Sequence, residues 1–260
     1  MAGLKGTPIS STYKSILRVD DNSNGVDSSL EVVTDGAGNQ SSIKIAKDAF
    51  GVRPSTDGEA FVIQDSSGAR ILSTDTSTQL TRVGAARDYV NTQYANFHMN
   101  SSWWATAADD THTALSFGAN QTSAIVGFGT GTDPATSFTT AEGSGTRGAE
   151  LVPCIWYVQD NITIDEVICI QGADTATGDT TRAHLMSYTY SSGASSALSS
   201  GAVIGYSGDQ VDAGSEQTYL NTMTISSADV NAGKAILAFL KSDSINSDYS
   251  LNIYIKYHLR

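Results

Sequence analysis

The chain has 260 residues, of which 16% are charged and 24 are Gly, and its formal net charge is −12 at pH 7. Few charged residues together with many Gly, Ser, Thr and Asn favour turns and short strands, so we expect a mainly β protein. The 15 Lys and Arg residues are scattered along the chain, which excludes a nucleic-acid-binding surface because phosphate binding needs clustered basic side chains.

Residues 1–40 contain two short candidate strands, Ile16–Val19 and Leu30–Val33, on either side of a loop rich in Asp and Asn. We expect this segment to attach the protein to a larger partner. Neither an apolar run of signal-peptide length after Met1 nor a run of about eighteen apolar residues is present, so the sequence predicts neither secretion nor insertion into a membrane.

The loop between the two candidate strands matches the calcium-binding pattern D-x-[DN]-x-[DN]-G-x5-E. In that interpretation Asp20, Asn22, Asn24 and Glu31 bind a hard cation, and Gly25 forms the sharp turn. The flanking segments are strand-like, however, and a hairpin stabilised by Asp and Asn side chains explains the same residues. We therefore predict no metal here, with calcium as the alternative.

Residues 41–84 alternate short, half-apolar strands with turn sequences such as Arg53–Ser55 and Ser66–Gly68. Roughly eleven large apolar side chains in about forty residues are too few for an independent core. We therefore expect copies of the chain to bury one another's apolar faces around a rotation axis, forming a β stalk. The alternative is a β-meander within one globular domain. The apolar strand positions are Ile43, Ile45, Phe50, Val52, Phe61, Ile63, Ile71 and Leu80.

Residues 85–100 are the best helix candidate, because Val90, Tyr94 and Phe97 follow one another at spacings of four and three. We predict a short neck helix between the stalk and the rest of the chain. A helix covering one edge of a sheet fits the same pattern.

Residues 101–260 contain about nine candidate strands separated by Gly, Ser and Asp loops, which predicts an antiparallel β-sandwich with a jelly-roll-like topology. Residues 235–240 are apolar throughout and predict a central strand covered on both faces. The C-terminal strand alternates, and its apolar side comprises Tyr249, Leu251, Ile253, Ile255, Tyr257 and Leu259.

Two of these segments support a family resemblance. The sequence FVIQDSSGARILSTDT…LTRV at 61–83 resembles the stalks of trimeric bacteriophage tail and head fibres. The sequence ISSADVNAGKAILAFLKSD at 225–243, followed by the Tyr-rich last strand, resembles the C-terminal head of fibre proteins from marine podoviruses. The resemblance implies a homotrimeric appendage of the virion, assembled in the host cytoplasm.

The same resemblance implies a function in adsorption. Residues 1–40 would join other virion proteins, and the head would contact a glycan or protein on the host cell surface. A head or neck fibre, or a decoration protein displayed on the capsid, is one alternative. A monomeric carbohydrate-binding β-sandwich is another.

Two Gly-rich sequences resemble phosphate-binding and catalytic motifs, but each lacks a required part of the motif or of its structural context. The sequence GSGTRG at 143–148 precedes a candidate strand instead of opening a helix, so it lacks the helix N-terminus that would bind a pyrophosphate. The sequence GYSGD at 205–209 falls one residue short of a nucleophile elbow. His98, His112, His184 and His258 are far apart and show no metal-ligand spacing.

We expect no catalytic residue, no cofactor and no metal. A glycan hydrolase would need two carboxylates at a set separation, and no pattern singles out such a pair. Hydrolysis of a host polysaccharide therefore stays an alternative without a sequence motif.

For binding, the candidates are aromatic residues near predicted loops, because aromatic faces suit both sugar rings and protein contacts. Adjacent Trp residues after a helix more often pack between subunits, and ordinary strand composition explains the Tyr residues. The candidates are Trp103, Trp104, Tyr188, Tyr190 and Tyr206.

Cys154 and Cys169 lie on neighbouring candidate strands, so a disulfide is geometrically feasible. Two Cys without a signal peptide fit reduced, packed thiols better, which is what we predict.

Overall fold

The computed structural model describes residues 17–19, 25–55, 58–84, 88–99, 110–118, 126–140, 148–174, 178–213, 217–243 and 248–260. The chain divides into two compact units, residues 1–90 and 91–260, which we call the N-terminal unit and the head. All strand pairs within the described ranges are antiparallel, and the few helical residues belong to one short segment. The predicted mainly β class is therefore confirmed.

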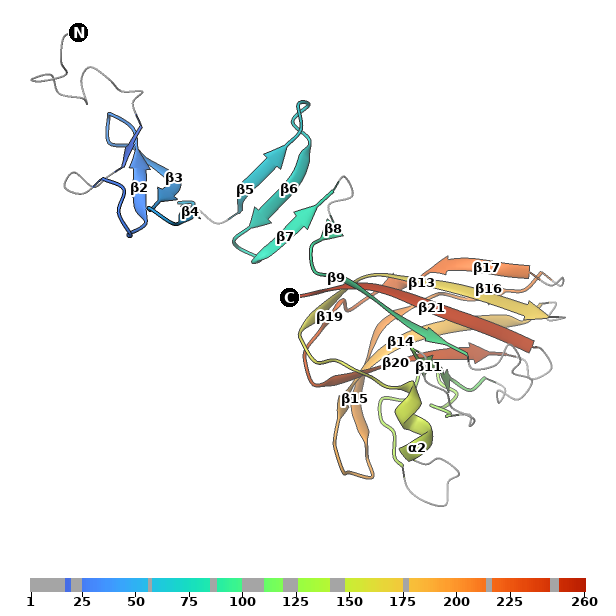
Figure 1. The fold of residues 1–260 in the computed structure, drawn as a ribbon. Helices are drawn as coiled ribbons and strands as arrows, with labels where there is room; N and C mark the ends of the chain where they lie inside the picture. Colours follow the sequence, from blue (N-terminus) through green and yellow to red (C-terminus); the bar gives the residue numbers. More distant parts are fainter. Residues whose placement is uncertain are drawn as a thin grey trace, which may run out of the picture. The chain divides into compact units, whose positions relative to one another are not determined.

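The N-terminal unit contains two small antiparallel sheets, each in simple sequence order (Figure 1). The strands of the first sheet are β1 (Arg18–Val19), β2 (Glu31–Thr34), β3 (Gln40–Ile45) and β4 (Phe50–Val52). The strands of the second sheet are β5 (Glu59–Gln64), β6 (Arg70–Asp75), β7 (Leu80–Val83) and β8 (Asp88–Tyr89).

Aspartate side chains close the hairpins of both sheets. Asp35 Oδ1 accepts hydrogen bonds from the backbone amides of Ala37 (2.9 Å) and Asn39 (2.8 Å), and Asp65 Oδ1 does the same for Ser67 (2.8 Å) two residues further on. Hydrogen bonds to the Asp35 carboxylate hold its pKa below the ordinary value. The largest contribution comes from the Asn39 side chain, and backbone amides add to it. These Asx turns are the reversals that the Asp- and Gly-rich turn sequences predict.

The predicted neck helix at 85–100 is wrong, because the described part of this range is β structure. Tyr89 belongs to β8, and residues 92–98 form strand β9 (Thr92–His98), which pairs with the C-terminal strand β21 (Asp248–Leu259) from Thr92 opposite His258 to His98 opposite Asn252. Tyr94 is exposed and Phe97 is buried, so the two side chains project from opposite faces of a strand. Hydrogen bonds between β9 and the distant strand β21 outweigh a helical pattern that consists of only three apolar residues.

The head is a sandwich of two antiparallel sheets (Figure 1). We name them after their long central strands. The β21 sheet has the order β11–β9–β21–β13–β17, with β19 beside β13. The β20 sheet has the order β10–β20–β14–β15–β18, with β12 beside β20 and β16 beside β14.

The remaining strands of the β21 sheet are β11 (Ser116–Phe117), β13 (Ile162–Asp174), β17 (Gln217–Thr222) and β19 (Asp229–Val230). Those of the β20 sheet are β10 (Thr113–Ala114), β12 (Trp156–Tyr157), β14 (Thr180–Tyr190), β15 (Leu198–Tyr206), β16 (Gln210–Val211), β18 (Thr224–Ile225) and β20 (Lys234–Ser242).

The main strands follow a jelly-roll order. Counting β9, β12, β13, β14, β15, β17, β20 and β21 as strands one to eight, the first, eighth, third and sixth are neighbours in one sheet. The second, seventh, fourth and fifth are neighbours in the other. This alternation of the chain between two sheets is the double Greek key of a jelly roll, as the sequence predicts.

Strand β20 is buried on both faces, as its continuous apolar run predicts. Ile236, Ala238 and Leu240 pack into the core between the two sheets. Leu237 and Phe239 pack into a second core on the other side of the β20 sheet.

The second core is closed by the chain between β11 and β12. Val126, Phe128 and Phe138 from loop segments, Leu151 from helix α2 (Gly148–Leu151), and Cys154 from the 3-10 turn Val152–Cys154 lie against the outward side of the β20 sheet. The β20 sheet is therefore covered on both sides by the head itself.

Candidate functional site

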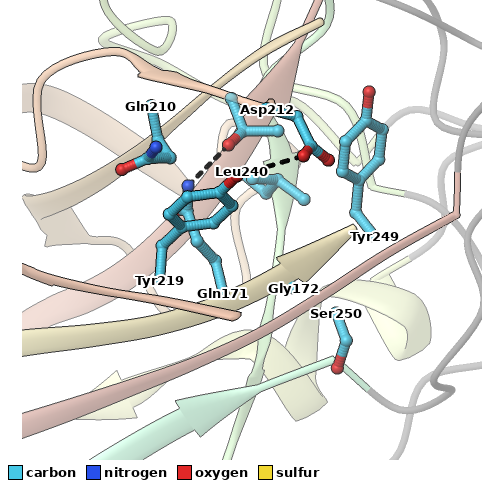
Figure 2. Close-up of a pocket in the computed structure, with 9 residues that line it drawn as sticks. Gln171, Gly172, Gln210, Asp212, Tyr219, Leu240, Tyr249 and Ser250 are labelled. Carbon is cyan, nitrogen blue, oxygen red and sulfur yellow. Dashed lines mark hydrogen bonds between the residues drawn. The ribbon is translucent and has the colours of Figure 1, made fainter. Parts of the chain in front are cut away.

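A polar pocket lies between the two sheets at one end of the head (Figure 2). Gln171 Nε2 donates a 2.8 Å hydrogen bond to Thr181 Oγ1, and both side chains are buried. The Tyr219 hydroxyl lies 3.1 Å from Asp212 Oδ1, and the Tyr249 hydroxyl lies 3.3 Å from an oxygen of Asp179 outside the pocket lining. Residues from β13, β14, β17 and β21 thus join the two sheets through hydrogen bonds.

This pocket is too small to bind an organic ligand. Its volume is about 10 Å³, which is room for a single water molecule and not for a sugar ring or a cofactor. Gln171 Oε1 has no hydrogen-bond partner in the described structure, so one water would satisfy a buried acceptor there. We interpret the pocket as a polar plug that closes the end of the sandwich.

A larger, charged cleft of about 380 Å³ opens beside the ends of β14 and β20. Arg182 Nε donates to Asp209 Oδ1 at 2.7 Å, and Lys241 Nζ lies 3.3 Å from Asp110 Oδ1. Asp243 Oδ1 accepts a 2.6 Å hydrogen bond from the Thr180 amide at the same end. Each basic side chain lining the cleft is paired with an acid, and Asp243 adds a third carboxylate, so the lining carries one net negative charge.

Two histidines are buried next to this cleft. The rings of His112 and His184 are fully buried and meet edge to face, with centroids 4.9 Å apart. His112 Nδ1 donates to the Gly129 carbonyl oxygen at 3.2 Å, whereas neither ring nitrogen of His184 has a hydrogen-bond partner. Burial is the main cause that lowers the pKa of His184 to about 3, and the charge of the neighbouring His112 is the second. The ring is therefore neutral at pH 7.

The predicted binding residues separate into three groups. Trp103 and Trp104 lie outside the described residues. Tyr188 is buried in the second core, where its hydroxyl donates to the Ala135 carbonyl oxygen at 2.9 Å, so its assignment as a binding residue is wrong for this head. Side chains alternate between the two faces along β14, and Tyr188 projects from the face of the β20 sheet that the second core covers. Tyr190 and Tyr206 are each 38% exposed.

The structure adds one aromatic residue that the sequence did not indicate. Tyr157 on β12 is half exposed, and its ring meets that of Tyr190 at 6.0 Å between centroids in an edge-to-face arrangement. An exposed aromatic pair suits contact with either a sugar or a protein. Tyr206 stands apart, 6.2 Å from the ring of His184.

The β21 sheet differs from the β20 sheet because no described residues of the head cover its outward face. Its inward side chains fill the core, but its other side carries a run of exposed apolar residues that crosses four adjacent strands. We call this set the apolar face of the β21 sheet. It comprises Tyr94 on β9 (74% exposed), Tyr254 on β21 (47%), Ile170 on β13 (39%) and Leu220 on β17 (66%).

Strand register brings these residues together. Ile170 is directly opposite Leu220 in the β13–β17 ladder, and Tyr254 is directly opposite Ile168 in the β13–β21 ladder. Tyr94 is opposite Lys256, two residues along the same face of β21. This surface could not be predicted from the sequence, because its members are scattered over 160 residues.

The sheets of the N-terminal unit also have uncovered apolar faces. In the second sheet, Ile63, Leu72 and Val83 form one cross-strand row, and Phe61 lies on the same side. Among the described residues of this unit, no large apolar side chain is buried. Those that are clearly exposed are Leu17, Val26, Leu30, Ile43, Phe50, Phe61, Ile63, Ile71, Val83 and Val90.

The opposite side of the second sheet mixes polar and apolar side chains. Val62 is directly opposite Ser73 there, Leu80 is directly opposite Asp75, and Ile71 is exposed. The Arg82 guanidinium lies over the Tyr89 ring at 4.6 Å and donates to its hydroxyl at 2.6 Å. Ser73, directly opposite Arg82, is buried there. The sheet thus has an apolar row on one face and a mixed polar and apolar surface on the other.

Cys154 and Cys169 are both free and buried, in different cores. Burial raises the pKa of each thiol to about 12, so both are unreactive thiols at neutral pH. The prediction of reduced, packed cysteines is confirmed.

Within the described residues, three or more His, Cys, Asp or Glu side chains do not come together in an arrangement suited to a metal ion. Asp20, Asn22 and Asn24, three ligands of the alternative calcium interpretation, lie outside the described residues. Nor does the described part of the chain contain a helix that is long and apolar enough to cross a membrane.

Comparisons with known proteins add little to this geometry. No protein-family model matches the chain, and no curated protein matches it. Among solved structures the chain is similar to the Eiger TNF of S. frugiperda, with 12% sequence identity and a TM-score of 0.30. That similarity covers 65% of this chain and 93% of the other. A likeness of this size carries no argument about function.

Proposed function

We propose that this chain is a subunit of a homotrimeric virion appendage, a bacteriophage tail fibre, that attaches the particle to its host cell. The N-terminal segment would join other virion proteins, the two small sheets would form the stalk, and the sandwich would be the head. The resemblance of residues 61–83 and 225–243 to fibre stalks and heads supports this proposal.

One observation carries the proposal: the described residues of the N-terminal unit bury no large apolar side chain. Burying such a side chain contributes about 1.5–3 kcal/mol, so leaving a row of them in water forfeits most of what would stabilise these sheets. Identical copies arranged around an axis would cover one another's apolar faces. A stalk built from several chains explains why the faces are apolar.

In this proposal the head binds and does not catalyse. The exposed pair Tyr157 and Tyr190 and the separate Tyr206 are the aromatic surfaces available for a host glycan or protein. Three heads on one rigid body would raise avidity even when each single contact is weak. This arrangement suits a receptor that is displayed densely on a cell surface.

The mass of the full chain in solution tests the proposal directly. One chain has a mass of 27.3 kDa, so the proposed trimer has about three times that mass, near 82 kDa. Sedimentation equilibrium over a dilution series should give the trimer mass, and imaging of intact particles should place the protein outside the capsid. A single 27 kDa species up to the highest concentration would contradict the trimer.

A second candidate is a monomeric carbohydrate-binding module, which is favoured by the two complete cores that the head builds within one copy. It predicts a monomer that binds polysaccharide and is absent from virions. A decoration protein on the capsid differs from a tail fibre only in location, which particle imaging distinguishes.

A further inference from the structure

Described residues of the head cover the outward face of one of its two sheets but not that of the other. Loop residues such as Phe128 and Phe138, with Leu151 of α2, cover the outward side of the β20 sheet and bury it. No comparable layer of described residues covers the apolar face of the β21 sheet, where Leu220 is 66% exposed and Tyr94 is 74% exposed. Adjacent large apolar side chains on one sheet face are characteristic of a contact surface.

We propose that the apolar face of the β21 sheet is the surface through which the heads of neighbouring copies of this chain contact one another. The inference rests on the proposed homotrimer and extends it from the stalk to the head. It assigns Tyr94, Tyr254, Ile170 and Leu220 to the interface between copies.

Charge favours a copy of the chain as the occupant. The whole chain carries a formal net charge of −12, so two copies repel each other over most of their surfaces. On this face Glu166 on β13 and Lys256 on β21 are directly opposite each other and offset each other's charge, whereas Asp174 and Asp248 are opposite each other at the far end of the same ladder. Between these two pairs the outward residues of β13 and β21 are uncharged, so this part of the face is where like-charged copies approach at least cost.

The N-terminal unit gives a second reason. Its sheets also present uncovered apolar faces, formed by Ile63, Leu72 and Val83 in one sheet and by Ile43 and Phe50 in the other. A partner of another kind would have to match three separate sheets of one chain. A copy of the chain supplies all three matching surfaces at once, because rotational symmetry repeats every face.

The test measures whether the face is covered in the full-length assembly. Leu220→Cys and Tyr254→Cys each place a thiol on the apolar face, and Val152→Cys is the matched control. Val152 is 63% exposed, nearly as much as Leu220, but it belongs to the 3-10 turn that covers the opposite sheet. The native Cys154 and Cys169 are buried and give little background in the folded protein.

Maleimide labelling is followed by mass spectrometry, with each rate divided by that of the same variant in urea. We expect the thiols at 220 and 254 to react roughly tenfold or more slowly than the thiol at 152, because labelling a covered site requires local opening of the interface. The solution mass of each variant is measured on the same samples.

The outcomes separate this inference from the proposed function. A trimer in which all three thiols react equally fast overturns the head interface and leaves the stalk trimer standing. A monomer in which all three react equally fast overturns both. A trimer with slow labelling at 220 and 254 only supports both.

Discussion

His184 Nε2 lies 3.5 Å from Asp133 Oδ1, too far for a strong hydrogen bond, although the His184 ring is fully buried. The other neighbour of this ring is a second buried histidine, His112. Nearby Arg182 and Lys241 also disfavour a positive charge on it. The head therefore holds His184 as a neutral ring whose protonation the fold opposes.

The first prediction concerns the pH dependence of stability. In the unfolded chain the pKa of His184 returns to about 6.5, whereas in the folded head it is about 3. Between these values the unfolded state binds a proton that the folded state does not, so the free energy of unfolding falls as the pH falls. His184 alone should lower it by about 2 kcal/mol between pH 7.5 and pH 5, measured by urea unfolding.

The variant His184→Phe isolates this contribution. Phe keeps a buried ring and removes two nitrogens that have no hydrogen-bond partner, so the variant should fold and be at least as stable at pH 7.5. Its loss of stability at pH 5 should be smaller than that of the wild type by about 2 kcal/mol. Identical losses in the two proteins would contradict the prediction.

The second prediction concerns the polar plug between the sheets. Gln171→Leu removes the donor to Thr181 Oγ1 and leaves a buried hydroxyl without its partner, which should cost about 1–3 kcal/mol of unfolding free energy. Adding Thr181→Val to that variant removes the orphaned hydroxyl and should recover part of the loss. Thermal unfolding of the two single variants and the double variant measures the coupling. Strictly additive losses would show that the hydrogen bond contributes nothing.

The third prediction separates Tyr188 from the exposed tyrosines. Tyr188→Phe removes the hydroxyl bonded to the Ala135 carbonyl oxygen and should cost about 1 kcal/mol of stability without changing adsorption to host cells. Tyr190→Ala should leave stability nearly unchanged and weaken adsorption, because its ring is exposed beside Tyr157. Adsorption of labelled protein to host cells measures the second effect, and weaker binding by the stable Tyr188 variant would reverse the assignment.

The fourth prediction concerns assembly of the N-terminal unit. Ile63→Asp places a charge within the row formed with Leu72 and Val83, so a copy of the chain could cover that row only by burying the charge. We expect the trimer to dissociate at protein concentrations at least roughly tenfold higher than for the wild type. Ser66→Asp, in an exposed turn of the same sheet, is the control and should assemble normally. Equal dissociation of both variants would count against the stalk.

The sequence was most informative where one strand carries its own pattern. The unbroken apolar run of β20 predicts burial on both faces, and Ile253 and Ile255 on β21 predict a strand buried on one face. Both features are properties of consecutive residues. Local periodicity therefore sufficed to predict these two strands and the mainly β fold class.

The sequence failed where long-range pairing decides the outcome. Val90, Tyr94 and Phe97 match a helical spacing, yet ladder hydrogen bonds to β21 make that region a strand. The sequence around Tyr188 predicts a surface aromatic residue, because nothing near it along the chain reveals the loop that covers it. Ile170 and Leu220 become neighbours only through the register of β13 and β17. Each of these errors concerns contacts between distant segments.

The absence of a buried apolar core in the described N-terminal unit has a kinetic consequence. The head can reach its folded state within one chain, at a rate that does not depend on how many chains are present. The two small sheets would instead mature by an encounter between chains, so their rate of formation should rise with the amount of protein synthesised. Newly made chains would therefore pass through a period in which the head is complete and the N-terminal sheets await their neighbours.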